Sequence, residues 1–327
     1  MNRSLFPFEW IVDAVDRIQP YTVQTQLVHD VEQDIYLKCE NRQVTGSFKV
    51  RGAFNKALTL QPWERELGLV AASAGNHGQG VALAGKILKT HVRIYCSSTA
   101  APNKIDAMRK LGAEVVMVAG GYGEAEKAGL EFASNSLTTW ISPYNDSQVI
   151  AGQGSISLEI LRSNSHLGSA TWIVPTSGGG LISGIGVGLK QISSEARLIA
   201  VQAVASPFMY ALYNDRIQDN IEDLPTIADG LSGPVQSGSI TIPLVQHYVD
   251  EFILIDESEI EMAIAFAWWQ YGEKIEGSAA TALAAILTGK VINRPAVLIL
   301  SGGNIQDEKF QEIISSHGKK STIRNIS

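Results

Sequence analysis

The chain has 327 residues, of which 45% are hydrophobic and 18% are charged, and its formal net charge is −7. This length suits one large domain or two of ordinary size, and the composition excludes a disordered chain. Because the net charge is negative and no long basic run occurs, nucleic acid and anionic membranes are excluded as partners.

The N-terminal segment has no signal-peptide pattern, because Glu9, Asp13 and Asp16 interrupt its apolar residues. No uninterrupted apolar stretch approaches the ~20 residues that a membrane-spanning helix needs. The two cysteines, Cys39 and Cys96, lie in apolar, strand-like runs, so we expect both to be buried and reduced. The sequence therefore predicts a soluble, cytoplasmic, globular protein.

A series of short apolar runs, rich in β-branched residues, predicts the strands. In chain order they are DIYLKC, LGLVAAS, HVRIYC, AEVVMVA, TTWISP, ATWIVP, RLIAVQA, EFILID and PAVLILS. Helix-like segments separate many of them, and buried strands that alternate with helices form parallel sheets. Gly-rich turns follow strands near residues 75 and 178, so we predict an α/β chain with two open, twisted, mostly parallel sheets flanked by helices.

The segment VTGSFKVRGA, residues 44–53, starts a predicted helix with a lysine in an unusual place. We expect Thr45 or Ser47 to cap the helix, which places Lys49 in its first turn. That turn presents free N–H groups and a partial positive charge, and it suits an anion better than an ammonium. The apolar stripe that predicts this helix consists of Val50, Ala53, Phe54, Ala57 and Leu58.

The turn AASAGNHGQG, residues 71–80, joins a predicted strand to a predicted helix. Ser73, Gly75, Asn76 and His77 at a helix N-terminus offer neutral donors to a small anion such as a carboxylate. An ordinary N-cap and turn explains an isolated stretch of this kind better, so the turn does not establish a site by itself.

A second Gly-rich turn lies in TWIVPTSGGGLISGIGVGLK, which reads as strand, turn and helix. The glycines at 178–180 can expose backbone N–H groups to a phosphate. Leu181 follows them where a P-loop needs lysine, and Ser183 stands where a dinucleotide fingerprint needs its third glycine. The next predicted strand ends on Gln202, which lacks the ribose-binding carboxylate. The turn indicates a phosphate cup of another kind, or a tight turn that merely needs glycine.

Other catalytic patterns do not assemble. The sequence contains no H-E-x-x-H, no C-x-x-C and no G-x-S-x-G. Its 6 histidines are scattered, and none has metal-ligand spacing with another. A third turn, LILSGGN at residues 298–304, is again a strand that ends in Ser-Gly-Gly.

Together these features resemble the fold-type II pyridoxal-phosphate enzymes, in the threonine/serine dehydratase (ammonia-lyase) branch. The matching segments follow the family's order along nearly the whole chain: YLKCENRQVTGSFKVRGA, SAGNHGQGVA, APNKIDAMRKLGAEV, VIAGQGSISLEI, TIADGL, EGSAATALAAIL and LSGGN. The resemblance implies a tryptophan-synthase-β-like fold. Residues 1–48 and 146–327 would form a large cofactor-binding domain and residues 49–145 a small one, with the active site in the cleft between them.

The resemblance also implies residues that bind pyridoxal 5′-phosphate. Lys49 would form the Schiff base with the cofactor and later serve as the catalytic base, and Phe48 would pack against the ring. Asn76 matches the residue that bonds the cofactor's 3′-oxygen, and Ser301 matches the partner of the pyridine nitrogen. The matching phosphate cup is Ser177, Gly178, Gly179, Gly180 and Leu181, where Ser177 departs from the family's usual glycine.

The implied reaction is the dehydration and deamination of a β-hydroxy amino acid, with the carboxylate bound by the loop of Ser73, Gly75, Asn76 and His77. L-Threonine would give 2-oxobutanoate, and L-serine would give pyruvate, each with ammonia. A neutral hydroxyl at Ser301 does not hold the pyridine nitrogen protonated as an aspartate would, which favours elimination over transamination.

Several alternatives stay open. A related dehydratase of 3-hydroxyaspartate, of a phenylserine or of a hydroxyectoine-pathway substrate is not separated by any motif. Serine racemase, a cysteine-synthase-like transferase and a non-enzymatic cofactor-binding module are weaker alternatives. The transferases typically have threonine after Gly-Asn and a Gly-Thr-Gly-Gly-Thr cup, where this chain has His77 and Ser177-Gly-Gly-Gly-Leu.

Departures from the relatives give further expectations. Relatives that bind a divalent cation have acidic residues where this chain has Gln202 and Phe208, so we expect no metal there. Racemase relatives have a serine directly before Gly-Asn-His, where this chain has Ala74, so we expect elimination with little racemisation.

The resemblance leaves the assembly and the regulation less defined. It implies a homodimer or a higher homo-oligomer, and it places Glu276 of EGSAA near the active site without a role. The chain ends soon after SGGN, so we expect no C-terminal regulatory domain and no feedback inhibition through one. We also expect the polar tail after residue 305 to fray.

Overall fold

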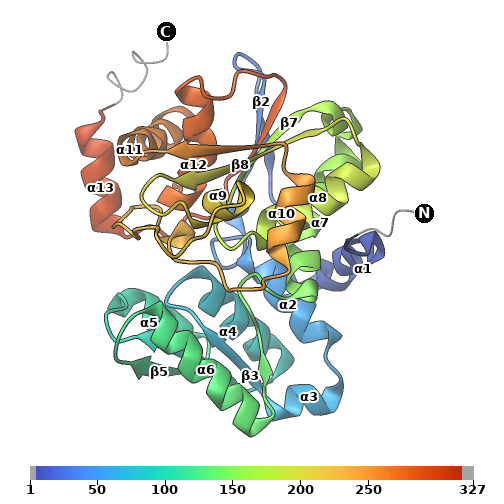
Figure 1. The fold of residues 1–327 in the computed structure, drawn as a ribbon, viewed down its shortest axis with the longest axis vertical. Coiled ribbons are helices and arrows are strands. Elements are labelled where there is room, and N and C mark those ends of the chain that lie inside the picture. Colours follow the sequence, from blue (N-terminus) through green and yellow to red (C-terminus); the bar gives the residue numbers. More distant parts are fainter. Residues whose placement is uncertain (1–4, 319–327) are drawn as a thin grey trace.

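The computed structural model describes residues 5–318 and contains two separate sheets, one above the other in Figure 1. The larger has the strand order β1-β2-β10-β7-β8-β9, and the smaller has the order β5-β4-β3-β6. The larger sheet consists of β1 (Leu27–Asp30), β2 (Ile35–Lys38), β7 (Thr171–Pro175), β8 (Arg197–Ala203), β9 (Glu251–Ile255) and β10 (Ala296–Ile299). The smaller consists of β3 (Leu69–Ala72), β4 (Val92–Ser97), β5 (Glu114–Val118) and β6 (Thr139–Trp140).

Every pair of neighbouring strands is parallel except β1 and β2, which pair antiparallel. Each apolar run in the sequence forms one of these strands, so the predicted α/β architecture with two mostly parallel sheets is confirmed. The sequence missed β1 because LVHD lies at the sheet edge, is only partly buried and carries two polar residues.

Helices cover both faces of the larger sheet. One face packs against α7 (Ser147–Ser163), α8 (Gly180–Ile192), α9 (Phe208–Tyr213) and α10 (Thr241–Tyr248), with α1 (Phe8–Ile18) outside α7 and α8. The other face packs against α11 (Glu257–Phe266), α12 (Gly277–Leu287) and α13 (Asp307–Ser316). Short turns complete this half: η1 (Gln19–Tyr21), η2 (Glu40–Arg42), η3 (Ser165–Ser169), η4 (Asp229–Leu231) and η5 (Ala267–Tyr271).

The smaller sheet is covered in the same way. Its inner core includes α2 (Lys49–Thr59), α4 (Asn76–Leu88) and α5 (Pro102–Lys110), and its other face packs against α6 (Tyr122–Ser136). The short α3 (Pro62–Leu67) connects α2 to β3. In α2 the predicted stripe is buried at Val50, Ala53, Phe54 and Ala57 and half-buried at Leu58.

We propose the domain division expected from the sequence, with residues 49–145 as the small domain and 1–48 with 146–327 as the large one. All four strands of the smaller sheet lie within 49–145, and all strands of the larger sheet lie outside it. In each sheet, the loops that follow the parallel strands lie at the same edge, where the strands have their carboxyl ends. The Gly-rich turns follow β3, β7 and β10.

Three smaller expectations can be compared with this fold. Both cysteines are free and buried, as predicted. The prediction of a fraying tail after residue 305 is wrong for 307–316, because Phe310, Ile313 and Ile314 bury the apolar side of α13 against the core; 319–327 lie outside the described residues. Within residues 5–318, no helix combines the length and the apolarity that crossing a bilayer requires.

Candidate active site

The start of α2 is fixed by strand-like pairing rather than by a side-chain cap. The helix begins at Lys49 after Phe48, whose backbone N–H donates to the carbonyl of Ser301 at 3.0 Å. The predicted caps are wrong, because the hydroxyls of Thr45 and Ser47 are buried without a hydrogen-bond partner. The end of β10 therefore holds the first turn of α2 in place.

Lys49 carries a partly buried amine that contacts a carbonyl oxygen rather than a described carboxylate. Its Nζ donates to the carbonyl oxygen of Pro143 at 3.0 Å and lies 5.2 Å from the centroid of the Phe48 ring. Among the described residues no carboxylate forms an ion pair with it. Burial lowers the pKa of Lys49 to about 8, although the carboxylate of Glu276 acts in the opposite direction. The amine is therefore close to the neutral state that a base or a nucleophile needs.

The triglycine turn lies near Lys49. Lys49 bonds the carbonyl of Pro143, and the next residue, Tyr144, packs against Gly178 and Gly180. A Cβ added at Gly178 would collide with the Tyr144 ring, and one at Gly180 would lie 2.9 Å from Tyr144 Cα. Gly179 has a φ of +83°, which favours glycine, and the Thr241 hydroxyl donates to the carbonyl of Gly178 at 2.7 Å. Glycine is thus required at 178–180 by contact as well as by conformation.

The backbone amides of this turn are available to a ligand. In the described part of the chain, the N–H groups of residues 177–181 donate to no protein acceptor, although 178–181 are buried. They stand at the N-terminus of α8, where the helix adds its partial positive charge. Unpaired, buried N–H groups in this place form a cradle for a phosphate.

The segment SAGNH runs into the first turn of α4, which begins at Asn76, as predicted. Gly75 caps the helix, its N–H donates to Ser73 Oγ at 3.1 Å, and a Cβ at Gly75 would meet open space. The N–H groups of Asn76 and His77 begin the helix and donate to no acceptor in residues 5–318. This helix start can therefore bind a carboxylate through its backbone amides.

The His77 ring differs from the neutral donor that the sequence suggests. It is buried, and its Nε2 lies 2.8 Å from the carbonyl oxygen of Ile141. Because a carbonyl only accepts, Nε2 carries the hydrogen, and Nδ1 is an unpartnered acceptor. Burial, and secondarily the charge of Lys49, lower the pKa of His77 to about 3, so the ring stays neutral. The donor that His77 can offer an anion is its backbone N–H.

Asn76 and Ser301 complete the set of predicted residues. Ser301 is buried at the end of β10, and its hydroxyl has no hydrogen bond to another described residue. The Asn76 amide contacts Glu276 and Asn304, and these two residues also line a cavity of about 390 Å³ that neither Lys49 nor the residues predicted for the active site line. Other contacts bring the three Gly-rich turns together around Lys49, at the site called the cleft below: Phe48 bonds Ser301, the Tyr144 ring lies against Gly178, and the charge of Lys49 acts on His77.

Sequence reasoning missed three parts of this cleft: the Pro143 carbonyl, the Tyr144 ring and the Asn304 amide. Pro143 and Tyr144 lie three and four residues after the end of β6, and Asn304 closes the turn after β10. The signal that was available is position, because ligands of open α/β sheets bind outside the carboxyl ends of the strands.

Gln202 and Phe208, where we expect no divalent cation, are engaged in contacts within the protein. Gln202 Oε1 accepts from the backbone N–H of Tyr210 at 3.0 Å, and Phe208 is packed in the core. Within residues 5–318 no group of three or more His, Cys, Asp or Glu side chains could hold a metal ion.

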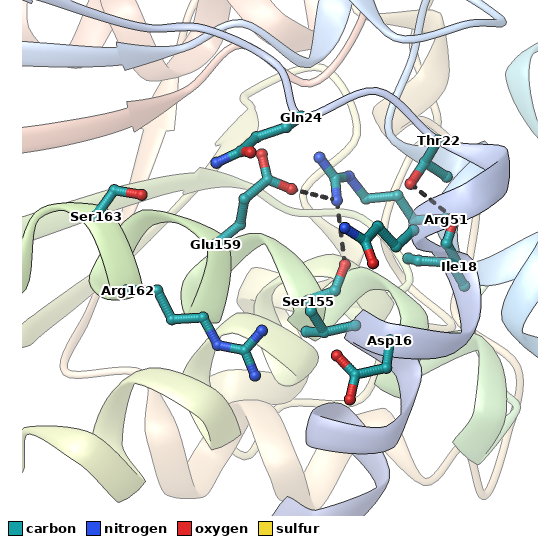
Figure 2. A pocket seen from close by; sticks show the side chains of 11 residues that line it. Asp16, Ile18, Thr22, Gln24, Arg51, Ser155, Glu159, Arg162 and Ser163 are labelled. Carbon is teal, nitrogen blue, oxygen red and sulfur yellow. Dashed lines mark hydrogen bonds and ion pairs between the residues drawn. The ribbon is translucent and has the colours of Figure 1, made fainter.

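A second cavity, of about 210 Å³, lies beside α2 on the side of Arg51. Figure 2 shows the Arg51 guanidinium bonded to Glu159 and to Ser155 at its wall. Arg51 also binds Glu40 through two N–H groups at 2.7 and 2.8 Å, and Lys38 pairs with Glu159. None of the residues predicted for the active site lines this cavity.

Comparison with known proteins finds relatives that agree with the resemblance seen in the sequence. The family model described as "Pyridoxal-phosphate dependent enzyme" matches residues 17–302. An L-threonine ammonia-lyase of Thermotoga maritima is 41% identical over 86% of this chain and 70% of its own. The processed form of threonine deaminase isoform 2 from Solanum lycopersicum superposes with a TM-score of 0.85 at 30% identity, covering 95% of this chain and 88% of that one. Maize serine racemase gives a TM-score of 0.88 at 28% identity, covering 96% and 98%.

The residues around the cleft fit pyridoxal phosphate. The unpaired amides of 177–181 suit a phosphate group. The Lys49 amine, with a pKa of about 8, is close enough to the neutral state to react with the cofactor's aldehyde. The Ser301 hydroxyl is free to face a pyridine nitrogen, and Asn76 retains an N–H beyond the one given to Glu276. Each of these groups is buried or half-buried without its full set of partners, as expected of a site built for a ligand.

Proposed function

Because the chain belongs to the pyridoxal-phosphate-dependent enzymes, in the group that includes the threonine ammonia-lyases, we propose that it converts L-threonine to 2-oxobutanoate and ammonia. L-Serine, which lacks one methyl group, would give pyruvate and ammonia. The observation that carries this proposal is the unpaired amine of Lys49 next to the unpaired amides of residues 177–181. A homo-oligomer, implied by the resemblance, stays a prediction.

Bound pyridoxal phosphate supplies an electron-accepting ring conjugated to the substrate's Cα. The chain's own contribution begins with Lys49, whose neutral Nζ removes the proton from Cα. Burial and the positive end of α2 both favour the neutral amine, and the Pro143 carbonyl orients it. This answers why a lysine occupies the first turn of α2.

The remaining groups bind and orient. The amides of 177–181 would hold the phosphate, and Asn76 would donate to the ring's 3′-oxygen. Ser301 would offer the pyridine nitrogen a hydroxyl, which would favour loss of the β-hydroxyl over transfer of the amino group. The amides of Asn76 and His77 with Ser73 bind the substrate carboxylate, and the neutral His77 ring adds no charge to that site.

Serine racemisation is the second candidate, because a serine racemase is among the similar structures. Racemisation needs a second acid or base on the face of Cα opposite Lys49. The residue before Gly75 is Ala74, whose methyl group cannot exchange a proton. We therefore keep elimination as the function. The specialist substrates 3-hydroxyaspartate, phenylserine and the hydroxyectoine-pathway compound are alternatives within the same chemistry.

The proposal is tested by incubating the cofactor-loaded protein with a panel of β-hydroxy amino acids and measuring keto acids and ammonia. We expect L-threonine to have the largest kcat/KM, with L-serine next and D-threonine unreactive. A larger kcat/KM for 3-hydroxyaspartate or phenylserine would assign the chain to a specialist. A colourless protein that takes up no cofactor would contradict the proposal as a whole.

A further inference from the structure

The side-chain amide of Asn76 is held at both of its ends. Its Nδ2 donates to Oε1 of Glu276 at 2.8 Å, and its Oδ1 accepts from Nδ2 of Asn304 at 2.6 Å. Asn76 belongs to the half built on the smaller sheet, whereas Glu276 and Asn304 belong to the other half. The contacts therefore join the two halves at the residue proposed to face the cofactor ring.

Glu276 and Asn304 also hold each other. The backbone N–H of Asn304 donates to Oε2 of Glu276 at 3.2 Å, and the second hydrogen on Asn304 Nδ2 goes to the carbonyl of Thr45 at 2.8 Å. Both residues are tightly enclosed. A Cβ on Gly302 would collide with Glu276 Oε1, and a Cβ on Gly46 would lie 2.5 Å from Asn304 Oδ1. These glycines therefore limit the two side chains on one side, while the other side faces the cavity of about 390 Å³.

The direction of every bond follows from two groups that can only accept. The Thr45 carbonyl accepts, so Asn304 must turn its nitrogen toward Thr45 and Asn76. Asn76 must then present its oxygen to Asn304 and its nitrogen to the Glu276 carboxylate, which also accepts. The network thereby fixes which way the Asn76 amide points, and it leaves one N–H of Asn76 without a protein acceptor.

We propose that Glu276 and Asn304 are positioning residues that fix the Asn76 amide so that its remaining N–H is presented to an oxygen of the cofactor ring. This inference rests on the proposed function and gives a role to Glu276. Glu276 acts as a carboxylate with one oxygen for Asn76 and the other for the Asn304 backbone. Asn304 transmits the orientation set by Thr45.

The electrostatics of Glu276 support this role. Burial raises its pKa to about 7, with Asp229 acting in the same direction, while Lys104 and the donors Asn76 and Asn304 lower it. The carboxylate form is therefore favoured by Lys104 and also by the two donors that Glu276 orients. A protonated Glu276 would lose an acceptor and gain an O–H, and the hold on Asn76 would weaken.

The test uses the cofactor-loaded protein and the variants Glu276→Gln and Asn304→Asp. A glutamine offers one oxygen and one N–H₂ group, so it cannot accept from both Asn76 and the Asn304 backbone. An ionised aspartate at 304 cannot donate to the Asn76 oxygen, so the Asn76 amide loses the donor that fixes its direction. The matched control is Glu261→Gln, because Glu261 lines the same cavity, pairs with Lys309 and does not contact Asn76.

The readouts are the cofactor's dissociation constant and the pH midpoint of its visible absorption. We expect both variants to weaken cofactor binding about tenfold, the effect of one lost bond to a charged or fixed partner, and to shift the midpoint as Asn76→Ala does. In the Asn76→Ala background, Glu276→Gln should change either readout by less than about twofold. Glu261→Gln should behave as the wild type, and circular dichroism confirms that each variant is folded.

The inference is overturned if both folded variants bind cofactor as tightly as the wild type with an unchanged midpoint. It is also overturned if the effects of Glu276→Gln and Asn76→Ala multiply, because Glu276 would then act independently of Asn76. A wild-type chain that takes up no cofactor would overturn the proposed function, and this inference with it.

Discussion

Two cations on one helix, the buried Arg51 and the partly buried Lys49, have opposite surroundings. Arg51 binds Glu40 twice and Glu159 once, at 2.7 to 2.8 Å. Lys49 has a carbonyl oxygen as its hydrogen-bond partner and no ion pair with a described carboxylate. Arg51 lines the cavity of about 210 Å³, which none of the residues predicted for the active site lines.

The difference shows how a charged residue that stabilises the fold can be told from one that takes part in the reaction. Burial alone lowers the pKa of Arg51, but the charges of Glu40 and Glu159 more than offset it, and the net pKa is raised. For Lys49, burial is offset only weakly, and the net pKa falls to about 8. A buried charge that is fully paired fixes the fold, whereas an unpaired group with a pKa near neutrality is typical of a reactive site.

The largest effect is expected for Lys49→Ala. Without the amine, no group near the cleft is placed to remove the Cα proton, so kcat for keto-acid formation should fall on the order of 10⁴-fold, the upper range for a positioned base. Lys56→Ala on the same helix is the control, because Lys56 is paired with Asp146 at 2.7 Å. Residual activity within tenfold of the wild type in Lys49→Ala would remove Lys49 from the chemistry.

The second effect is on stability. Arg51→Met leaves Glu40 and Glu159 buried near Lys38 without their main partner, so the free energy of unfolding should fall by about 3–5 kcal/mol. Urea denaturation followed by circular dichroism measures it. A loss below about 1 kcal/mol would show that the ion pairs of Arg51 do not stabilise the fold as proposed here.

The third effect concerns the face of the substrate that Lys49 does not reach. With Ala74 in place, D-serine should form from L-serine at least about a hundredfold more slowly than pyruvate. Ala74→Ser should narrow this ratio, because a hydroxyl there can exchange a proton. Chiral chromatography of a timed reaction gives the ratio, and comparable rates in the wild type would mean that another residue serves the second face.

The smallest expected effect is that replacing Lys49 by methionine, which abolishes catalysis, raises the free energy of unfolding. The pKa of Lys49 is about 8 in the folded chain and 10.5 as its ordinary value, so the unfolded state holds this proton more tightly. The loss of folding stability that Lys49 causes is therefore complete below about pH 8, and it disappears as the pH rises toward 10.5. Lys49→Met should therefore stabilise the cofactor-free chain by about 1–3 kcal/mol near neutral pH and by almost nothing at pH 10.5. Equal effects at both pH values would contradict the unpaired state of Lys49.

The sequence predicted the strands and the turns that carry chemistry, because their apolar runs and glycines are local signals. It placed Lys49 correctly in the first turn of α2, but it did not predict what holds that turn, because Phe48 pairs with Ser301 across about 250 positions of chain. The Asn76–Glu276–Asn304 contacts and the Arg51 network likewise join distant segments. The tautomer of His77 depends on the Ile141 carbonyl, which no spacing rule connects to it.

The central claim is that Lys49, and not another of the chain's lysines, is the reactive amine of the cleft. Reducing the cofactor-loaded protein with borohydride fixes the bond between pyridoxal phosphate and its lysine, and peptide mass spectrometry then locates the added mass. The account predicts one modified peptide, with the label on Lys49. A label on another lysine, such as Lys38, or no stoichiometric label on a protein that retains its visible absorption, would contradict it.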